Sequence, residues 1–332
     1  MKKWLIIALI LACASCSQIE ERAENELFLN TSPNKPLILD VDFSTDVDDV
    51  CAVRIATALD DKGVIDLKCV GYSVRGENNL QAMRGMLLHE GKDDVPIGRS
   101  SVDIPDTSPY WSLMTRHDDG KGEVMDAVKL YRKILAESKR RVDIITTGYV
   151  TNIELLLKSE PDEYSPLTGE ELIKQKCGQL YIVGGVFPEG YDNNFFFAKP
   201  ARAAIDYVNR NWPYPIVYFL AQVGGPMICG AGLQAIDREN KDIVSQALTA
   251  FGTSTGRYAW DPYGVWCAAY ACGEVNQTGL RRADLEIRVS DGYNKFYVNP
   301  DGRHYINYRL CDDDKYYNSA MDSIVISKAK LQ

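Results

Sequence analysis

Short apolar runs alternate with amphipathic stretches from residue 36 onward, and this alternation is the feature that most limits how the chain can fold. The runs are uninterrupted rather than alternately polar, so we expect both faces of each strand to be covered. We predict strands at 37–39, 67–72, 95–97, 142–146, 180–183 and 216–220. Helices are predicted at 48–59, 80–89, 124–138, 152–158 and 201–211. This order indicates an α/β fold with an open, mostly parallel sheet and helices on both faces.

The pattern changes after residue 240. Two further helices are predicted at 242–251 and 262–271, followed by a strand-rich C-terminal tail at 285–310. We find no internal repeat and no Gly/Ser linker, so residues 36–332 are predicted to form a single domain. In open parallel sheets, ligands bind beyond the carboxyl ends of the strands. The functional residues are therefore expected in the loops that follow the strands.

The first fifteen residues have the layout of a secretory signal peptide. Lys2 and Lys3 precede an apolar stretch at 4–12, and small residues follow it. The small residues before Cys16 resemble a bacterial lipoprotein box, with Cys13 the alternative lipidation site and a plain cleaved signal the other alternative. We predict a signal at 1–15, a polar tether at 16–35, and a lipid anchor on Cys16. The chain would then be an exported bacterial lipoprotein at the outer membrane, facing the periplasm or the cell surface.

Charge and cysteine content exclude two kinds of function. The 332-residue chain has 37 basic and 46 acidic side chains, a net charge of −9, so it would repel a polyanion. No nucleic acid polymer is expected as a partner. The nine cysteines lack the spacing of a zinc site. We predict neither a disulfide framework nor thiol catalysis.

Five carboxylates follow the first predicted strand within ten residues: Asp40, Asp42, Asp46, Asp48 and Asp49. Such like charges repel one another unless a proton or a cation relieves them. Capping of the next helix would explain Asp46 or Asp48. It does not explain Asp40 and Asp42, which directly follow a buried strand. We therefore predict a metal or catalytic cluster.

Two families carry a signature of this kind. In haloacid dehalogenase-like phosphatases, which use Mg²⁺, a strand ends in DxDx[TV] and a later strand ends in Ser or Thr. The segments 40–44 and 144–146 resemble those motifs, with Asp40 as the nucleophile. In distant nucleoside hydrolases, the strand is followed by DxDxxxDxDD, which residues 40–49 match at every position.

The later strand ends favour the nucleoside hydrolases. Thr147 and Gly148 stand in a segment that resembles the PTGxLTN motif, and residues 182–185 resemble xMGG. Residues 192–200 resemble a degraded ribose-binding segment, and 260–262 resemble the [HW]DP motif. The resemblance, to inosine/uridine-preferring nucleoside hydrolases, covers about residues 36–325. It implies a Rossmann-like fold and hydrolysis of the N-glycosidic bond of a ribonucleoside or related riboside.

The resemblance also implies roles for individual residues. Ca²⁺ would be held by Asp42, Asp49, Asp261 and the main-chain carbonyl of Thr147. Asp42 would act as general base toward the attacking water, and Asp48 would accept hydrogen bonds from the ribose hydroxyls. Carboxylates and carbonyls from separate loops are the oxygen ligands that Ca²⁺ prefers. A small-molecule riboside or nucleoside is thus the expected partner.

Other candidates depend on less regular matches. Candidate sugar contacts are Asn78, Asp192, Asn193 and Asn194. Trp260 stands where the family has a leaving-group His, and it is a candidate substrate contact. His117, in a loop that the family places over the site, is a candidate catalytic acid, with a solvated loop histidine as the alternative. His89 and His304 are expected to be structural or exposed.

Trp260 and the altered ribose segment also motivate a second hypothesis, a sugar- or nucleoside-binding lipoprotein with weakened catalysis. The phosphatase is the third. Nucleoside hydrolases are often dimeric or tetrameric, so the resemblance leaves a homo-oligomer open.

Overall fold

The computed structural model describes residues 22–23, 25–44, 46–76, 78–270, 279–307 and 314–331. The predicted signal peptide and both candidate lipidation sites, Cys13 and Cys16, lie outside the described residues. Within the described ranges, no helix has both the length and the apolar character needed to cross a membrane.

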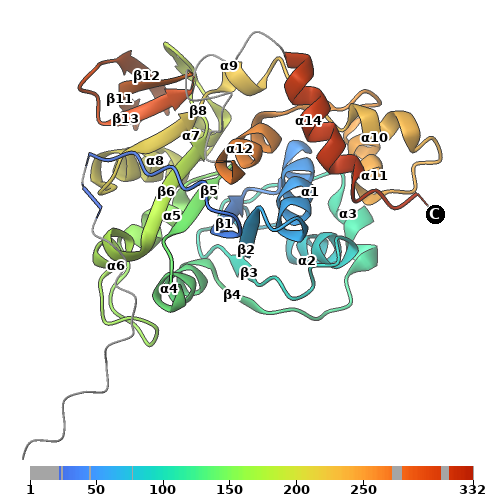
Figure 1. The fold of residues 1–332 in the computed structure, drawn as a ribbon, viewed down its shortest axis with the longest axis horizontal. Coiled ribbons are helices and arrows are strands. Elements are labelled where there is room, and N and C mark those ends of the chain that lie inside the picture. The colour runs from blue at the N-terminus through green and yellow to red at the C-terminus, as the bar shows by residue number, and fades with distance from the viewer. Residues whose placement is uncertain are drawn as a thin grey trace, which may run out of the picture.

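Eleven strands form one mixed sheet in the order β4-β3-β2-β1-β5-β6-β8-β13-β11-β12-β7 (Figure 1). The strands from β4 to β13 in this order run parallel, and β11, β12 and β7 complete the sheet with antiparallel pairs. The bounds are β1 Lys35–Val41, β2 Ile65–Tyr72, β3 Ile97–Arg99, β4 Val124–Asp126, β5 Val142–Thr146, β6 Cys177–Val183, β7 Glu189–Tyr191, β8 Ile216–Phe219, β11 Leu280–Arg288, β12 Tyr293–Val298 and β13 His304–Asn307. A separate antiparallel pair joins β9 (Ile228–Cys229) to β10 (Arg257–Tyr258). The mostly parallel α/β sheet that the sequence predicts is confirmed.

The strand order reverses at β1. After β1 the chain adds β2, β3 and β4 on one side, then returns to the other side of β1 to add β5, β6 and β8. The loops that follow the neighbouring strands β1 and β5 therefore leave the carboxyl edge of the sheet in opposite directions. Such a switch point is where open α/β sheets bind their ligands.

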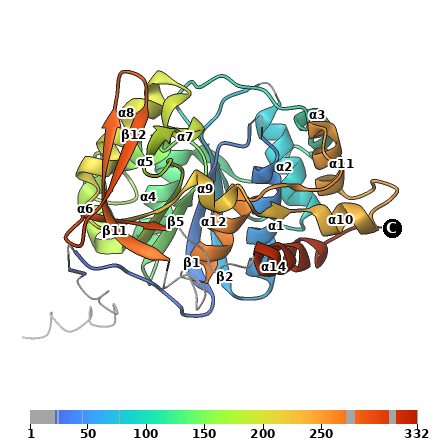
Figure 2. The ribbon, with the colours of Figure 1, turned by 90° about the horizontal axis from the view of Figure 1, so that it is seen from above.

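Helices cover both faces of the sheet. In Figure 2, α1, α2, α12 and α14 lie on one side of the central strands and α4, α5, α6 and α8 on the other. The larger helices are α1 Asp48–Asp61, α2 Asn79–His89, α4 Ala127–Glu137, α5 Thr151–Leu157, α6 Gly169–Lys176, α8 Lys199–Asn211, α11 Ile243–Phe251, α12 Trp260–Ala269 and α14 Asp314–Ile326. The shorter ones are α3 Trp111–Met114, a 3₁₀ turn Thr115–His117, α7 Asn193–Phe196, α9 Ala221–Gly224 and α10 Ala231–Ile236. Helix α1 packs against α12 and α14, which brings the start of α12 close to the loop after β1.

The structure differs from the sequence prediction at several element ends. The predicted helix at 124–138 begins only at Ala127, because Val124–Asp126 forms the edge strand β4. Asp126 caps α4, since its Oδ1 accepts the backbone N–H groups of Val128 and Lys129 at 3.0 and 3.1 Å. The sequence analysis also missed α6, β7 and α14. The predicted tail at 285–310 is confirmed as strand-rich where it is described.

Part of the predicted tether packs against the body of the molecule. The Arg22 guanidinium lies 4.1 Å from the centre of the Tyr214 ring and donates to the side chain of Gln179 at 3.1 Å. The Phe28 N–H also donates to Gln179, at 3.2 Å. Lys35, at the end of this segment, is fully buried and pairs with Asp143 at 3.1 Å. Arg22 and Phe28 of the predicted tether therefore contact the domain.

Five cysteines lie in the described residues: Cys51, Cys69, Cys177, Cys229 and Cys267. All five are free and buried. Burial raises the pKa of the Cys69 and Cys177 thiols, which disfavours the reactive thiolate.

Candidate active site

A cavity of about 510 Å³ opens at the carboxyl edge of the sheet, beside the switch point. We call it the acidic cavity. Its walls come from the loops after β1, β5 and β6 and from the starts of α1, α7, α9 and α12. The lining residues are Asp42, Ser44, Asp46, Asp48, Asp49, Asp106, Thr147, Val183, Gly184, Tyr191, Asp192, Asn193, Asn194, Phe197, Ala221, Phe251, Trp260 and Asp261. Seven of them are aspartates and none of them is Lys, Arg or His, so the cavity suits a cation or a group that develops positive charge.

Four of these aspartates are buried and come from distant parts of the chain. Asp42 follows β1, Asp48 and Asp49 open α1, and Asp261 lies in the first turn of α12. Their exposed fractions are 7%, 4%, 1% and 6%, respectively. The packing of α12 on α1 joins them. The structure thus brings Asp261 together with Asp42, Asp48 and Asp49 of the predicted cluster. These are the four aspartates to which the family resemblance gives a role toward the metal or the sugar.

Backbone and hydroxyl donors hold two of the carboxylates. The Phe43 N–H donates to Asp49 Oδ2 at 3.1 Å, and the Thr147 hydroxyl donates to Asp49 Oδ1 at 3.4 Å. The Asp261 N–H donates to Asp48 Oδ2 at 3.2 Å. The carboxyl groups are therefore positioned by the loops after β1 and β5 and by α12.

Within the described residues, no Lys, Arg or His forms an ion pair with any of these four carboxyl groups, and the charge of Arg257, which pairs with Asp46, offsets only part of the pKa shift of Asp48. Burial raises the pKa of Asp42, and it raises the pKa of Asp48, Asp49 and Asp261 well above the usual range, with repulsion among neighbouring carboxylates adding to the effect. Asp49 lies close enough to Asp42 and Asp261 for its carboxyl group to affect the pKa of both. A proton shared between carboxyl groups, or a cation, is the physical means of keeping this arrangement stable.

The donor set fits a hard divalent cation. Three carboxylates and the carbonyl oxygen of Thr147 border the cavity, and oxygen ligands of this type suit Ca²⁺. The Thr147 carbonyl already accepts the Asn194 side-chain N–H at 2.8 Å, which leaves one lone pair for another partner. In the part of the chain that the structure describes, no three acidic, histidine or cysteine side chains converge in a ready-made metal site. The fit therefore lies in the chemistry of the donors rather than in preformed coordination geometry.

Two backbone features fix the loops at this edge. A Cβ on Gly148 would lie 2.4 Å from the backbone nitrogen of Asp42, so only glycine allows the loops after β5 and β1 to approach this closely. Phe43 has a φ of +52°, a strained conformation for a bulky residue. Its carbonyl accepts the Trp111 indole N–H at 2.9 Å, and its buried ring packs edge-on against Tyr110 at 5.5 Å. The strained turn that carries Asp42 is thus held by the segment around α3.

The predicted sugar-binding segment forms another part of the cavity wall. Asp192 caps α7, accepting the Asn194 N–H at 3.0 Å, and burial raises its pKa to about 6. The side chain of Asn194 donates to the carbonyls of Thr147 and Val183 at 2.8 and 3.0 Å, which ties α7 to the ends of β5 and β6. Asn193 is exposed at the cavity. All three predicted sugar contacts of this segment line the acidic cavity.

Aromatic side chains complete the cavity. Trp260, Phe197, Tyr191 and Phe251 line it. The Trp260 indole N–H donates to the Ala221 carbonyl at 2.7 Å, so this group is engaged within the protein. The Phe197 ring is exposed and stacks on Tyr149 at 5.7 Å. These rings form the apolar part of the cavity wall, and the aspartates form the acidic part.

Three residues of the sequence analysis lie elsewhere. His117 does not line the acidic cavity; it ends the 3₁₀ turn and contacts the His89 ring at 5.3 Å, beyond the far end of α2. Asn78 precedes α2 and lines a different cavity. Asp40 is fully buried and accepts the Asn152 amide at 2.8 Å and the Tyr131 hydroxyl, so it does not face the cavity as a phosphatase nucleophile would. His117 and Asn78 thus lie outside the lining of the acidic cavity, and their proposed roles stay predictions.

The sequence analysis missed other residues of the cavity: Asp106, Tyr191 and Phe251. It also missed Arg257, which pairs with Asp46 through two hydrogen bonds of 2.9 and 2.6 Å. The Arg257 guanidinium lies 5.0 Å from the Phe251 ring and 5.2 Å from the Trp260 ring. No motif marked these residues, and only the position of Arg257, three residues before Trp260, could have drawn attention to it.

By its fold and its cavity, the chain belongs to the class of open α/β proteins with an acidic site, lined by oxygen atoms, at the switch point of the sheet. No model of a known protein family matches the chain. The pyrimidine-specific ribonucleoside hydrolase RihA of Escherichia coli O81 (strain ED1a) is 26% identical over 174 residues, which are 47% of this chain and 50% of RihA. The chain spans about half the length of the curated relatives it matches.

Solved structures agree over a longer stretch. A purine-preferring ribonucleoside hydrolase from Gardnerella vaginalis matches with a TM-score of 0.66 and 16% identity, covering 89% of this chain and 99% of that one. An inosine-uridine preferring nucleoside hydrolase from Bacillus anthracis matches with a TM-score of 0.62 and 14% identity, covering 90% and 100%. At these identities the matches establish the fold. The chain has a nucleoside hydrolase-like fold.

Proposed function

We propose that this chain hydrolyses the N-glycosidic bond of a ribonucleoside or a related riboside, with the acidic cavity as its active site. The observation that carries the proposal is the convergence of Asp42, Asp48, Asp49 and Asp261, all buried, at the switch point of the sheet. The ribonucleoside hydrolases among the similar proteins support the reaction class.

The residues of the acidic cavity would have different roles in the reaction, according to their positions. Asp42 would take the proton of an attacking water as general base. Asp48 would accept hydrogen bonds from ribose hydroxyls, and the segment with Asp192, Asn193 and Asn194 would bind the rest of the sugar. As the bond to the leaving group breaks, positive charge develops on the sugar, and the aspartates around it would stabilise that charge.

A bound Ca²⁺, held by Asp42, Asp49, Asp261 and the Thr147 carbonyl, would neutralise the crowded carboxylates and make the attacking water more acidic. The donor chemistry of the cavity supports this choice of ion.

Departure of the leaving group depends on other residues of the cavity. No histidine lines the cavity in the described part of the chain, and Trp260 donates its only N–H to Ala221. The aromatic wall of Tyr191, Phe197 and Trp260 suits a flat leaving group by stacking. We infer that the natural leaving group departs with little help from a protein acid.

The same observation favours one second candidate, a protein that binds a nucleoside or sugar without turning it over. An engaged Trp260 in place of a leaving-group acid would weaken catalysis and leave the sugar site intact. The two candidates differ in one measurable property, the release of product.

The test is release of nitrophenol from p-nitrophenyl β-D-ribofuranoside by the full chain, in Ca²⁺ and in excess chelator. This leaving group needs no acid, so the assay depends only on the water, the carboxylates and the sugar site. We expect turnover in Ca²⁺ that chelator abolishes and Asp42→Asn removes. The Asp40→Asn variant separates this proposal from a phosphatase, since Asp40 lies outside the cavity and its loss should leave measurable turnover.

Folded protein that binds ribose in a calorimetric titration but releases no nitrophenol would replace the hydrolase by the binding protein. Turnover that chelator does not change would exclude the proposed role of the cation.

We further propose, from the sequence at 1–16, that the chain is an exported lipoprotein anchored through Cys16. Incorporation of labelled fatty acid by the wild type and not by Cys16→Ser is the expected result. Labelling that persists in Cys16→Ser and disappears in Cys13→Ser would move the anchor to Cys13.

A further inference from the structure

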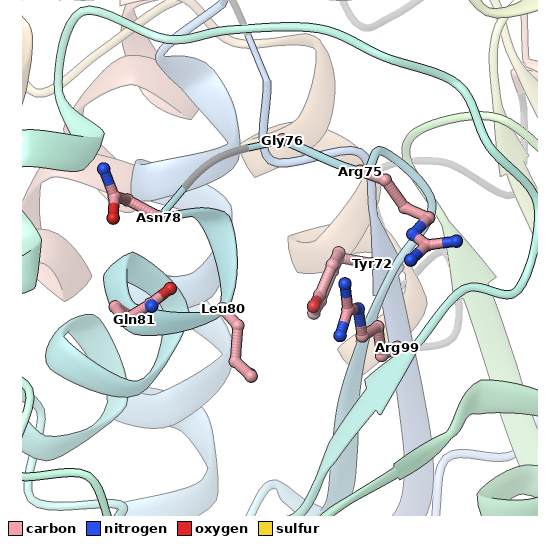
Figure 3. A pocket seen from close by; sticks show the side chains of 7 residues that line it. All are labelled: Tyr72, Arg75, Gly76, Asn78, Leu80, Gln81 and Arg99. Carbon is pink, nitrogen blue, oxygen red and sulfur yellow. The ribbon is translucent and has the colours of Figure 1, made fainter.

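A second cavity, of about 200 Å³, lies at the carboxyl edge of the sheet between the ends of β2 and β3 and the start of α2 (Figure 3). We call it the arginine cavity. Tyr72 ends β2, Arg99 ends β3, and the two are partners in the parallel register of these strands. In Figure 3, Tyr72 and Arg99 face Asn78, Leu80 and Gln81 across the cavity, and the Arg75 side chain lies beyond Tyr72 with its guanidinium group directed away from α2.

The positive charges of the arginine cavity are not neutralised within the described residues. Neither Arg75 nor Arg99 has a side-chain hydrogen bond or an ion pair there, and no carboxylate of the described chain lines the cavity. Arg84, on the same helix as Gln81, shows the contrast, since it pairs with both oxygens of Asp118 at 2.9 and 3.0 Å. Two unpaired guanidinium groups at one cavity are unusual in a chain with a net charge of −9.

Tyr72 adds a buried donor without a protein partner. Its side chain is 1% exposed, and its hydroxyl group is directed into the arginine cavity (Figure 3). This hydroxyl makes no hydrogen bond within the described residues. Burial raises the pKa of Tyr72 to about 12, against the opposing effect of the Arg99 and Arg75 charges, so the phenol keeps its proton at neutral pH. The hydroxyl group reaches the open space of the cavity, where it can donate a hydrogen bond to a ligand.

The facing wall is also short of negative charge. Asn78 precedes α2 with a φ of +65° and makes no side-chain capping hydrogen bond, and the first turn of α2 contains no acidic residue. Among the described residues of this turn, no carboxylate offsets the positive end of the helix dipole next to the cavity. Gln81 adds a side-chain amide to the same wall.

We propose that the arginine cavity binds a phosphate group. Guanidinium groups, a phenol and the start of a helix together offer the charged donors that phosphate oxygens accept. At about 200 Å³ the cavity is smaller than a site for a whole nucleoside, but it has room for one tetrahedral anion. This inference does not depend on hydrolysis in the acidic cavity.

The two cavities share a wall. The Arg75 N–H donates to the Ile104 carbonyl at 3.0 Å, and Arg75 pairs with Pro105 in an isolated bridge. The next residue, Asp106, lines the acidic cavity. A Cβ on Gly76 would lie 2.8 Å from the Asp106 carbonyl oxygen, so the segments pack closely. The phosphate can therefore be a free ion or a group carried by a sugar that occupies the acidic cavity.

Calorimetric titration of the full chain with inorganic phosphate, ribose 5-phosphate and ribose, at fixed ionic strength, tests the proposal. We expect phosphate to bind at one site and Arg99→Ala to weaken it by about tenfold or more, the effect of a lost charged hydrogen bond. Tyr72→Phe, which removes only the hydroxyl group, should weaken it by about threefold to tenfold. Arg116→Ala is the matched control, because Arg116 is exposed and lines neither cavity, and it should bind phosphate like the wild type.

Equal affinities for phosphate and ribose 5-phosphate would identify a free phosphate site. Tighter binding of ribose 5-phosphate, lost in both Arg99→Ala and Asp48→Asn, would show that one ligand spans both cavities. Phosphate binding that Arg75→Ala and Arg99→Ala leave unchanged, or no binding by the folded wild type, would overturn the proposal. A failure of the hydrolase assay would not affect any of these titrations.

Discussion

Helix α1 contributes to two buried clusters of charge, and they are balanced in opposite ways. At its start, Asp48 and Asp49 join Asp42 and Asp261 at a cavity that no Lys, Arg or His of the described residues lines. One and a half turns later, the fully buried Arg54 donates to Glu90 at 2.7 Å and to both oxygens of Asp242 at 3.1 and 3.2 Å. The first cluster lines a cavity, and the second lies between packed helices.

The pKa shifts record this difference. Burial alone would raise the pKa of Asp242, but the His89 ring, whose Nε2 lies 4.0 Å from the carboxylate, and the charge of Arg54 bring it well below the usual range. Burial and neighbouring carboxylates raise the pKa of Asp49 instead. A buried carboxylate that the protein neutralises itself serves the fold, whereas one left without a partner is available to a ligand.

The largest expected effect is on activity, from Asp49→Asn. We expect turnover of p-nitrophenyl riboside to fall by about a thousandfold, or ~4 kcal/mol in the barrier, because a proposed cation ligand is lost. Stability in chelator should stay within about 1 kcal/mol of the wild type, because the change removes a repelling charge and keeps one acceptor oxygen. Turnover assays and urea unfolding measure the two quantities. A large loss of stability with intact turnover would make Asp49 a structural residue like Asp242.

The Arg54 cluster should respond in the opposite sense. Arg54→Met leaves Glu90 and Asp242 buried without their cation, and we expect a loss of about 3–5 kcal/mol in the free energy of unfolding. Urea unfolding in chelator measures it, with the exposed Arg116→Ala as the control for loss of one positive charge. If Arg54→Met were as stable as the control, Arg54 would not balance the cluster.

A smaller effect concerns pH. His304 is buried, its Nδ1 accepts the Ile216 N–H at 3.1 Å, and its Nε2 lies 3.0 Å from the Asn209 carbonyl. Burial lowers its pKa to about 4. Between an unfolded pKa of about 6.5 and this value, the unfolded chain binds the extra proton, so stability falls as pH falls through that range.

The expected loss from His304 is about 3 kcal/mol between pH 6.5 and 4, with no further change below. Carboxyl groups with raised pKa, such as Asp192, act in the other direction, so the informative quantity is the difference between wild type and His304→Gln. That difference should shrink as the pH falls. A difference that does not depend on pH would place the charged form of His304 in the native state.

Local sequence patterns predicted the fold and the cluster of aspartates after β1. Uninterrupted β-branched runs indicated the central strands, and the crowded aspartates after β1 indicated a site, because neither pattern depends on distant residues. Thr147 and Asp261 were found through the family resemblance, and the structure places both at the acidic cavity.

The missed features depend on tertiary packing. Tyr191 reaches the cavity only because β7 joins the far edge of the sheet, beyond β12, and a three-residue strand has no clear sequence signal. Arg257 meets Asp46 from a position 211 residues away. The position of His117 away from the cavity lining could not be predicted either, because the length of a loop does not reveal its direction.

The most direct test of the central claim is the stability of the full chain with and without Ca²⁺. A ligand that binds only the folded state at a hundred times its Kd stabilises it by about 2.7 kcal/mol. We predict a gain of this size for the wild type and for Arg116→Ala, no gain for Asp49→Asn, and reversal by chelator. Equal stability of the wild type in Ca²⁺ and in chelator would contradict the claim that the unpartnered carboxylates of α1 form a cation site.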